Sequence, residues 1–593
     1  MLYPQQNDVR NVLELSGLWQ FKLDPSDVGE AEAWFNGLQD SRLIAVPGSW
    51  NEQFEDTRDY LGVAWYALET FVPKSWQSER SFIRVGSANY HARVWVNGQV
   101  VGEHAGGHLP FAFDISSALN WDKPNLIAIR VENNLEPTRV PPGDLKGGFL
   151  GGFMTNYPNT SYDFFPYAGL HRPVKLFSTP KNAIEDITVI TSVEAGGAGT
   201  VQVQLRQTGK VQAVARLVGE GETLEQAFQV ESGAASTIFR LDKPRLWSPK
   251  DPYLYALEIE LGEDGKTLDR YSLDVGIRSV EVRGKELLLN GEPIFLKDFG
   301  KHEDFPIHGR GLNLPVLVRD HSLFKWLGAN SYRTAHYPYS EEAMQMADRE
   351  GILIIDETPA VGIFFEDGAE NIALRLKQCE QHLQELVERD KNHPSVIMWS
   401  VANEPLPPDL RLRFAGAEVP PLDPSTTDFF RTLVDLSRKL DPSRPVTLAG
   451  IHGSPVEWFE LCDVVLVNRY FGWYSQQGRL DEGKRMLEAE LDDLFGKLGK
   501  PMIVSEFGAD TLAGFHSNPP EMFSEEYQRD FIKGYLDVAD ARDFIIGMHV
   551  WNFADFKTGQ GIMRVAGLNH KGVFTRDRKP KMAAHLLRER WQD

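Results

Sequence analysis

The chain has 593 residues and a formal net charge of −22 at pH 7, with 42% hydrophobic and 25% charged residues. This is the composition of a soluble globular protein that is too long for one hydrophobic core, so we expect roughly three or four domains. The negative charge argues against nucleic acid and against an anionic membrane surface as partners, because phosphate groups favour clustered Lys and Arg.

The cysteine content, the N-terminal residues and the lengths of the apolar runs indicate the cellular compartment. The two cysteines, Cys379 and Cys462, are too few for a disulfide framework and do not form a metal site by themselves. The first residues lack a basic start followed by an apolar segment, so no signal peptide is expected. No uninterrupted apolar run approaches the ~18 residues that a membrane span requires. We therefore predict a cytoplasmic protein without a membrane segment.

Short strands separated by turn residues are typical of residues 1–180. Asn97–Gly98 lies between two of them and is a strong β-hairpin signal. We expect a jelly-roll β-sandwich here. The glycine-rich segment Gly143–Gly152 lacks the Gly-Lys-Ser/Thr ending of a phosphate loop, so it is predicted to be a surface loop. The expected strands are Ser81–Val85, Ala92–Val96, Gln99–Val101, Leu126–Val131 and Pro173–Phe177.

Residues 181–278 continue with strands that alternate apolar and polar residues. Ile187–Ile190, Val201–Leu205 and Tyr253–Ile259 are examples. About a hundred residues of this pattern favour an immunoglobulin-like β-sandwich. It contains no catalytic pattern, so a spacer domain is the simplest interpretation.

Residues 279–593 alternate buried strands with amphipathic helices such as Leu374–Arg389 and Glu525–Asp540. Eight strands in this arrangement predict a (β/α)8 barrel. The expected strands are Ile294–Asp298, Ser331–Thr334, Ile352–Asp356, Val396–Val401, Val446–Ala449, Val464–Val467, Met502–Ser505 and Ile546–Val550.

Two glutamates occupy matching positions in this pattern. Glu404 follows the fourth barrel strand and Glu506 follows the seventh, so both are expected at the carboxyl-terminal face, where barrels keep their active sites. A single strand-end glutamate is more often part of an ion pair. Two on one face suggest a glycoside hydrolase, in which one carboxylate attacks the sugar and one carboxylic acid protonates the leaving oxygen.

The sequence also resembles glycoside hydrolase family 2, and within it the β-glucuronidases, through essentially the whole chain. The motifs that carry the resemblance are DFFPYAGLHRPVKL (Asp163–Leu176), GKHED (Gly300–Asp304), GANSYRTAHYPY (Gly328–Tyr339), RDKNHPSVIMWSVANEP (Arg389–Pro405), NRYFGWY (Asn468–Tyr474), IVSEFGADTLAG (Ile503–Gly514), WNFADF (Trp551–Phe556) and NHKGVFTRDRKPK (Asn569–Lys581).

The resemblance implies a role for each matching residue. Glu404 would be the acid/base and Glu506 the nucleophile of a retaining reaction. Asn403 would bind the sugar 2-hydroxyl, Tyr470 would orient Glu506, and Asp163 would reach a ring hydroxyl from the first domain. The remaining implied substrate contacts and neighbours are His302, Arg333, Asn468, Tyr474 and Trp551.

The same resemblance makes Asn569–His570–Lys571 the marker of a uronic acid substrate. Burying the C6 carboxylate of such a sugar requires a cation with hydrogen bonds. Lys571 would supply the charge, Asn569 an amide donor and Arg564 a second cation. Outside this family, an Asn-x-Lys triplet is usually a solvated turn.

Two segments depart from better-known family members. The segment after Val361 is too short for the lid that covers the site in some bacterial members, and Leu406–Pro424 is enlarged. We interpret this as a more open mouth that admits larger aglycones or oligosaccharides. The pattern between Arg564 and Asn569 contains one extra residue, which weakens the alignment of Arg564.

The sequence therefore predicts an exo-acting retaining β-glucuronidase for small-molecule or oligosaccharide glucuronides. It requires no cofactor, and His302–Glu303–Asp304 is not expected to bind a metal. Family resemblance implies a homodimer or homotetramer. The alternatives are a β-galacturonidase, β-galactosidase or β-mannosidase of the same family, because Lys571 can serve either uronic epimer, and a carbohydrate-binding protein on an inactive barrel.

Overall fold

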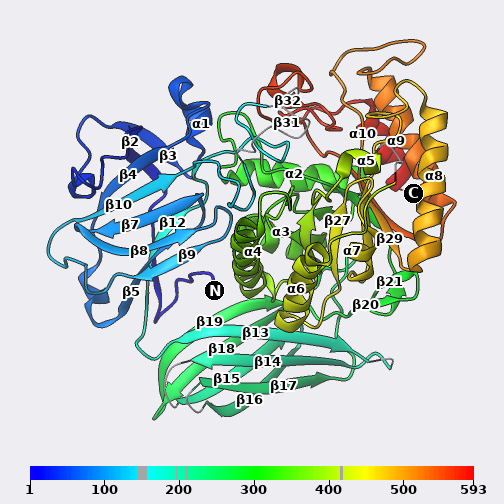
Figure 1. The fold of residues 1–593 in the computed structure, drawn as a ribbon. Helices are drawn as coiled ribbons and strands as arrows, with labels where there is room; N and C mark the ends of the chain where they lie inside the picture. Colours follow the sequence, from blue (N-terminus) through cyan, green and yellow to red (C-terminus); the bar gives the residue numbers. More distant parts are fainter. Residues whose placement is uncertain (144–155, 195, 208–210, 231–232, 415–417, 593) are drawn as a thin grey trace.

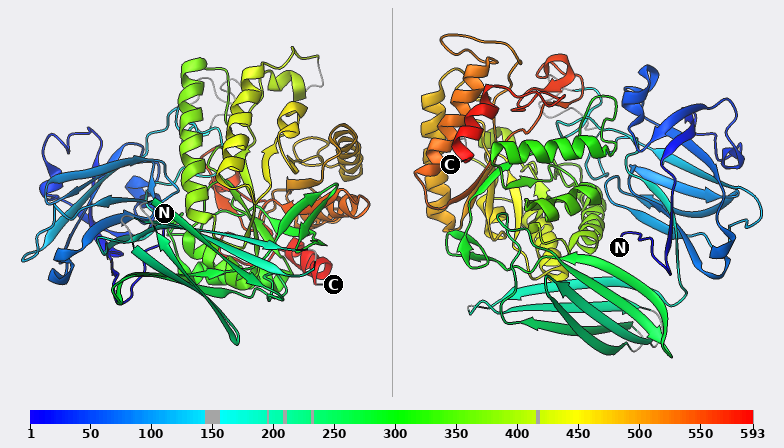
Figure 2. Two further views of the ribbon diagram at one scale, coloured as in Figure 1. Left: turned by 90° about the horizontal axis from the view of Figure 1, so that it is seen from below. Right: turned by 180° about the vertical axis from the view of Figure 1, so that it is seen from behind.

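In the computed structural model, residues 1–143, 156–194, 196–207, 211–230, 233–414 and 418–592 are described, and they form two β-sandwiches packed against a barrel (Figure 1). The first sandwich is blue, the second is teal to green, and the barrel is green to red. The views from below and from behind agree that both sandwiches contact the barrel (Figure 2). The predicted fold class is confirmed.

The first sandwich consists of a four-stranded and a six-stranded antiparallel sheet with one hydrophobic core between them. Asn97 and Gly98 have φ values of 51° and 80°, as the predicted hairpin turn requires. Pro173 lies just outside its predicted strand. The four strands of one sheet are β1 (Asn11–Glu14), β12 (Val174–Thr179), β5 (Arg80–Val85) and β9 (Phe111–Asp114); those of the other are β3 (Arg42–Val46), β2 (Gly17–Asp24), β4 (Val63–Thr70), β10 (Asn125–Glu132), β7 (His91–Val96) and β8 (Gln99–Ala105).

The second sandwich has a three-stranded and a four-stranded sheet. Alternation of buried and more exposed residues along each strand explains why the two sheets pack face to face. In β15, for example, the side chains of Val211, Ala213, Ala215 and Leu217 are buried between the sheets. The strand predicted to begin at Tyr253 begins two residues later, after an irregular stretch. The strands of the two sheets are β13 (Ile184–Val193), β14 (Gly199–Gln207) and β17 (Gly233–Leu241), and β16 (Glu222–Val230), β15 (Val211–Gly219), β18 (Tyr255–Glu263) and β19 (Lys266–Val275).

The barrel is an eight-stranded parallel sheet whose strands are almost entirely buried, as strands covered on both faces must be. A parallel bridge between Gly300 and Arg333 joins its first and second strands. The strands are β23 (Leu296–Phe299), β24 (Ser331–Arg333), β25 (Leu353–Glu357), β26 (Val396–Asn403), β27 (Val446–Gly450), β28 (Val465–Asn468), β29 (Met502–Phe507) and β30 (Ile545–Val550).

Helices cover the outside of the barrel (Figure 1). The two that the sequence predicted are α4, which is longer than expected, and α9, whose N-cap Ser524 accepts a hydrogen bond from the backbone of Tyr527. The helices are α2 (Leu314–Leu327), α3 (Glu341–Glu350), α4 (Ala369–Asp390), α5 (Leu410–Phe414), α6 (Pro424–Leu440), α7 (Val456–Glu460), α8 (Leu480–Leu498), α9 (Glu525–Asp540) and α10 (Met582–Trp591). No helix among the described residues is both long and apolar enough to span a membrane.

Backbone contacts between two distant chain segments bring part of the first domain to the barrel mouth. Tyr157 and Phe164 form backbone bridges with Gln560 and Thr558, which belong to the loop between β31 (Phe556–Lys557) and β32 (Leu568–Asn569). This contact holds residue 163 beside the triplet that ends at residue 571.

Candidate active site

Glu404 and Glu506 both lie at the carboxyl-terminal end of the barrel. Glu506 is the fifth residue of β29, and its Cα is the register partner of Asn468 on β28. Glu404 follows directly after β26 and turns out of the strand with φ +43°, a left-handed conformation that is uncommon for a residue with a side chain. Its backbone N–H donates to the carbonyl of Ala449 at 2.8 Å. These backbone positions direct the two carboxyl groups to one site.

Glu506 accepts hydrogen bonds on both of its carboxylate oxygens. Nη2 of Arg333 lies 2.6 Å from Oε1, and the hydroxyl of Tyr470 lies 2.8 Å from Oε2. Burial and the charge of Glu506 hold the pKa of Tyr470 well above its ordinary value, so the phenol stays protonated and donates. A cation and a phenol therefore stabilise Glu506 as the carboxylate.

Glu404 has a weaker set of donors. Its Oε1 accepts from the side-chain amide of Asn468 at 2.9 Å. The same amide donates to Oδ1 of Asn403 at 3.2 Å, while Oδ1 of Asn468 accepts from Ser505. Asn403 also accepts from Arg333 at 3.3 Å, so its oxygen is engaged and its amide N–H groups are the donors that it can offer to a ligand.

Both carboxyl groups have raised pKa values. Burial is the largest cause at Glu404, where Asn468 and the charge of Arg333 act in the opposite direction. At Glu506, burial and the charge of Glu404 raise the pKa to about 8, against Arg333 and Tyr470. Two interacting acids lose their protons in separate steps, so the pair keeps one proton near neutral pH. The stronger donors at Glu506 favour Glu404 as the group that keeps it.

A buried charge cluster lies against Glu506, and sequence reasoning missed two of its members, Glu357 and His336. Glu357, at the end of β25, accepts from Nη1 of Arg333 at 2.7 and 2.8 Å and from Nδ1 of His336 at 2.9 Å. Burial lowers the pKa of His336 to about 4, so its ring is neutral. Glu357 thus fixes the guanidinium that contacts Glu506. The signal was present, because Glu357 is also an acid at the end of a buried barrel strand.

The residues predicted to bind a uronic acid form one cluster, which we call the pocket, and Tyr470 links it to Glu506: its ring lies 5.7 Å from the ammonium of Lys571 and its hydroxyl donates to Glu506. Lys571 is fully buried, and its ammonium donates to the hydroxyl of Tyr474 at 2.9 Å. Arg564 donates to the same hydroxyl at 2.9 Å and to Asp163 at 2.7 Å. The amide of Asn569 donates to the other oxygen of Asp163 at 2.7 Å. The extra residue after Arg564 therefore does not remove Arg564 from the pocket.

Asp510 is the pocket member that sequence reasoning missed entirely. Its Oδ2 lies 2.5 Å from the ammonium of Lys571 and 3.5 Å from Arg564. Burial raises the pKa of Asp510, but these two cations outweigh it and lower the pKa below its ordinary value. Asp510 follows Glu506 by four residues, and this proximity in sequence was the available signal.

An aromatic wall completes the site. The ring of Trp551 stacks on His336 with centroids 4.9 Å apart, and His302 packs edge-on against it at 5.3 Å. Nδ1 of His302 contacts the hydroxyl of Tyr337 at 3.1 Å, and its Nε2 has no partner among the described residues. A Cβ at Gly300 would lie 2.3 Å from the indole of Trp551, so glycine is needed for this approach.

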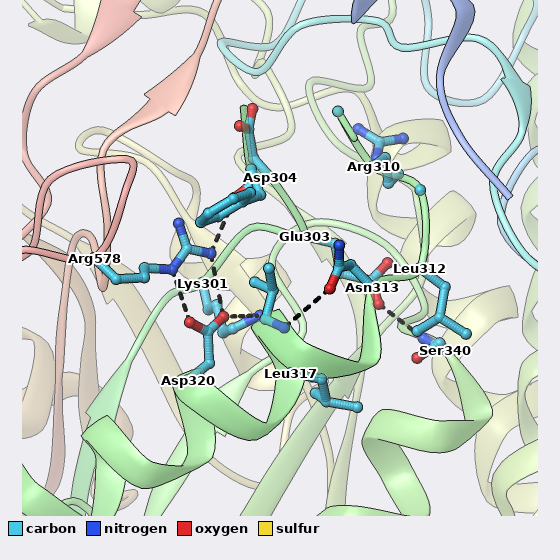
Figure 3. A pocket seen from close by; sticks show the side chains of 14 residues that line it. Lys301, Glu303, Asp304, Arg310, Leu312, Asn313, Leu317, Asp320, Ser340 and Arg578 are labelled. Carbon is cyan, nitrogen blue, oxygen red and sulfur yellow. Dashed lines mark hydrogen bonds and ion pairs between the residues drawn. The ribbon is translucent and has the colours of Figure 1, made fainter. Parts of the chain in front are cut away.

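A small cavity of about 40 Å³ lies at the start of α2, and Lys301 and Glu303, the chain neighbours of His302, help to line it (Figure 3). Asp320 pairs there with Arg578 at 2.7 Å and with Lys301 at 3.3 Å, and Asp304 pairs with Arg576 at 2.5 Å. These ion pairs neutralise one another's charges, and they tie the loop that carries His302 to α2 and to residues 576–578.

Two segments singled out in the sequence lie partly outside the described residues. Leu406 donates its backbone N–H to Ile363, which joins the short segment after Val361 to the enlarged segment Leu406–Pro424. Residues 415–417 of the enlarged segment and residues 144–155, which include most of the predicted surface loop Gly143–Gly152, lie outside the described residues. Among the residues that are described, no group of three or more His, Cys, Asp or Glu side chains is arranged to hold a metal ion.

The fold and the pair of barrel glutamates define a three-domain glycosidase. Family models match the entire architecture: the sugar binding domain of glycosyl hydrolases family 2 at residues 12–180, the glycosyl hydrolases family 2 domain at 182–278, and the family 2 TIM barrel domain at 280–593. The chain belongs to glycoside hydrolase family 2.

Relatives over the full length carry one activity in their names. A beta-glucuronidase of Paenibacillus borealis is 42% identical, with 100% of this chain and 98% of the relative covered. The Homo sapiens beta-glucuronidase is 40% identical, with 100% and 92% covered. The structure of Ruminococcus gnavus b-glucuronidase in complex with C6-substituted uronic isofagomine superimposes with a TM-score of 0.91 at 38% identity, covering 100% of this chain and 99% of that one.

Proposed function

We propose that this protein is an exo-acting β-glucuronidase that hydrolyses β-D-glucuronides to glucuronic acid and an aglycone with retention of configuration. The observation that carries the proposal is the pair of cations formed by the buried Lys571 and the mostly buried Arg564, together with the buried amide of Asn569. A sugar carboxylate loses its hydration in such a pocket and needs charge and donors in return. The full-length similarity to curated beta-glucuronidases supports the same substrate.

In the proposed first step, Glu506 attacks the anomeric carbon while Glu404 gives its proton to the leaving oxygen. The hydrogen bonds from Arg333 and Tyr470 to Glu506 support its role as the ionised nucleophile. In the second step, Glu404 removes a proton from water, which attacks the glycosyl ester and releases the sugar with its original configuration.

The remaining assignments concern the sugar ring. The amide of Asn403 donates to the 2-hydroxyl, and Asn468 holds both Asn403 and Glu404 in place. Trp551 and Nε2 of His302 face the sugar, and Asp163, held by Arg564 and Asn569, accepts from a ring hydroxyl. Tyr474 accepts from both pocket cations, which leaves its own O–H to donate to the sugar carboxylate.

A panel of 4-nitrophenyl β-glycosides tests the substrate. We expect release from the glucuronide, with the galacturonide, galactoside and mannoside at least about tenfold slower in kcat/KM. Proton NMR of the first product should show the β-anomer. Faster release from the galacturonide would assign the other uronic epimer, and faster release from the galactoside would overturn the carboxylate pocket.

Four further features are proposals as well. The boundaries 1–180, 181–278 and 279–593 stay a prediction, and the matched family ranges support them. Cytoplasmic location is supported by the two buried free cysteines, Cys379 and Cys462. Assembly as a homodimer or homotetramer rests on family resemblance, and light scattering of the purified protein measures it. An open mouth that admits larger aglycones follows from the short segment after Val361.

A further inference from the structure

Asp510 combines three properties that no other described acid in the site shares. It is buried, it lies 2.5 Å from the ammonium of Lys571, and it belongs to the segment that carries Glu506. In the part of the chain that the structure describes, it is the one carboxylate within ion-pair distance of Lys571. The proposed function assigns a role to Lys571 but none to its partner.

The surroundings of Lys571 require such a partner. The ammonium is fully buried among the rings of Tyr470, Trp473 and Tyr474, whose centroids lie 4.8 to 5.7 Å away. Aromatic faces attract a cation but do not replace a counter-ion, and a buried ammonium without a carboxylate loses its proton or moves toward water. Asp510 supplies that counter-ion inside the pocket before any substrate arrives.

The second oxygen of Asp510 fixes the direction of that pair. Oδ1 accepts the backbone N–H of His570 at 2.8 Å, and the backbone N–H of Thr511 donates to the carbonyl of His570 at 3.0 Å. The carboxylate is therefore bound at both oxygens and cannot rotate away from Lys571. It couples the segment that follows β29 to the loop that carries Asn569 and Lys571.

The donors of Lys571 leave room for a substrate. An ammonium has three N–H groups, and Asp510 and Tyr474 accept from two of them. The third is available to a sugar carboxylate. A carboxylate next to Lys571 has two conceivable effects: it competes with the sugar carboxylate for the ammonium, or it holds the ammonium in place for the sugar. The fixed geometry of Asp510 and the third N–H of Lys571 favour the second effect.

We propose that Asp510 is a positioning residue for substrate specificity: by holding Lys571 in place, it confers the preference for a sugar with a C6 carboxylate. The inference rests on the proposed function and adds a residue that acts on specificity through Lys571. It makes no contact with either catalytic glutamate in the described structure, so chemistry at the anomeric carbon does not depend on it directly.

Inhibitors that differ only at C6 give the test. Uronic deoxynojirimycin carries a carboxylate there and deoxynojirimycin a hydroxymethyl group, and the ratio of their inhibition constants measures carboxylate recognition. The full chain is measured as wild type, Asp510→Asn, Asp510→Ser and Asp510→Glu. We expect Asn and Ser to reduce the preference for the uronic inhibitor by at least about tenfold, and Glu, which keeps the charge, to stay within about threefold of wild type.

Asp510→Asn and Asp510→Ser both remove the charge of this residue, and the smaller Ser leaves room for a water molecule. If one of the two variants does not fold, the other still gives the test. Asp555→Asn is the matched control, because Asp555 forms another buried Asp–Lys pair, with Lys581 at 2.8 Å, that holds the same loop. This control should lower the thermal unfolding midpoint without changing the inhibitor ratio.

The outcomes separate this proposal from the proposed function. An unchanged ratio in the neutral variants, an increased uronic preference, or an equal loss in Asp555→Asn overturns the role of Asp510 while the function stands. A wild-type protein that does not prefer the uronic inhibitor overturns the proposed function itself.

Discussion

The glutamate end of the site and the proposed carboxylate-binding end around Lys571 balance their charges differently. Around Glu506, Arg333 pairs with Glu506 and Glu357, and burial together with the charge of Glu404 raises the pKa of Glu506. Around Lys571, two cations face two acids within a few ångströms of one another. In the proposed function, the buried pair of acids retains a proton for catalysis, whereas the balanced set of charges stays fixed for recognition.

The largest effect is expected at Glu506, the proposed nucleophile. Glu506→Gln should lower kcat on 4-nitrophenyl β-glucuronide by about 10⁴-fold or more, because no carboxylate remains to attack the anomeric carbon. The fold should be retained, since glutamine occupies the same volume. As a control, Glu341→Gln breaks the buried ion pair with Arg84 and should change stability rather than kcat. Activity above about 1% of wild type in Glu506→Gln would contradict the assignment.

The next effect distinguishes the acid from the nucleophile. Glu404→Ala should lower kcat/KM by about 10²–10⁴-fold for aglycones that leave as basic alkoxides, because general acid catalysis is worth that much. Acidic phenols need no proton and should be affected far less in the glycosylation step. A series of aryl and alkyl glucuronides measures this difference. A loss independent of the leaving group would show that Glu404 does not act as the acid.

At the carboxylate-binding end the effect should be smaller and selective. Lys571→Ala should cost about 2–5 kcal/mol of transition-state binding for a glucuronide, because the sugar carboxylate is then buried without its cation. The inhibition constant of neutral deoxynojirimycin should change little. Near wild-type kcat/KM on the glucuronide would remove the main argument for a uronic acid substrate.

The smallest effect is a shift in pH dependence. The charge of Glu404 raises the pKa of Glu506, so removing that charge should lower it. In Glu404→Gln, measured with an aglycone that needs no proton, the acidic limb of kcat/KM reports ionisation of Glu506. That limb should lie at lower pH than in wild type, since the ionised nucleophile then persists to lower pH. A limb at the same or higher pH would show that the two carboxyl groups do not interact.

Much of the fold followed from sequence because the patterns are local. Eight buried strands alternating with helices predicted the barrel, and α9 begins and ends at the predicted residues. The errors are at strand ends: the strand expected from Tyr253 begins at Tyr255, and that expected from Ile294 begins at Leu296. Strand ends depend on which neighbour completes the hydrogen-bond ladder, and neighbours far apart in sequence leave no local pattern.

The site residues show the same difference between local patterns and contacts over long sequence distances. Glu404 and Glu506 were found because each ends a buried strand, and family resemblance added Asn569 and Lys571. Glu357 and Asp510 escaped because an acid is recognised as functional only when its partner is known. Their partners, Arg333 and Lys571, are 24 and 61 residues away in the chain.

The amino-acid sequence by itself determined the three kinds of domain, the strand-end positions of the two glutamates and the presence of an Asn-His-Lys triplet, since all of these are expressed in contiguous residues. Only the tertiary structure decided which acid faces which cation. Charge pairing in a buried site depends on distances of a few ångströms between segments such as Asp163 and Arg564, and chain order does not encode those distances.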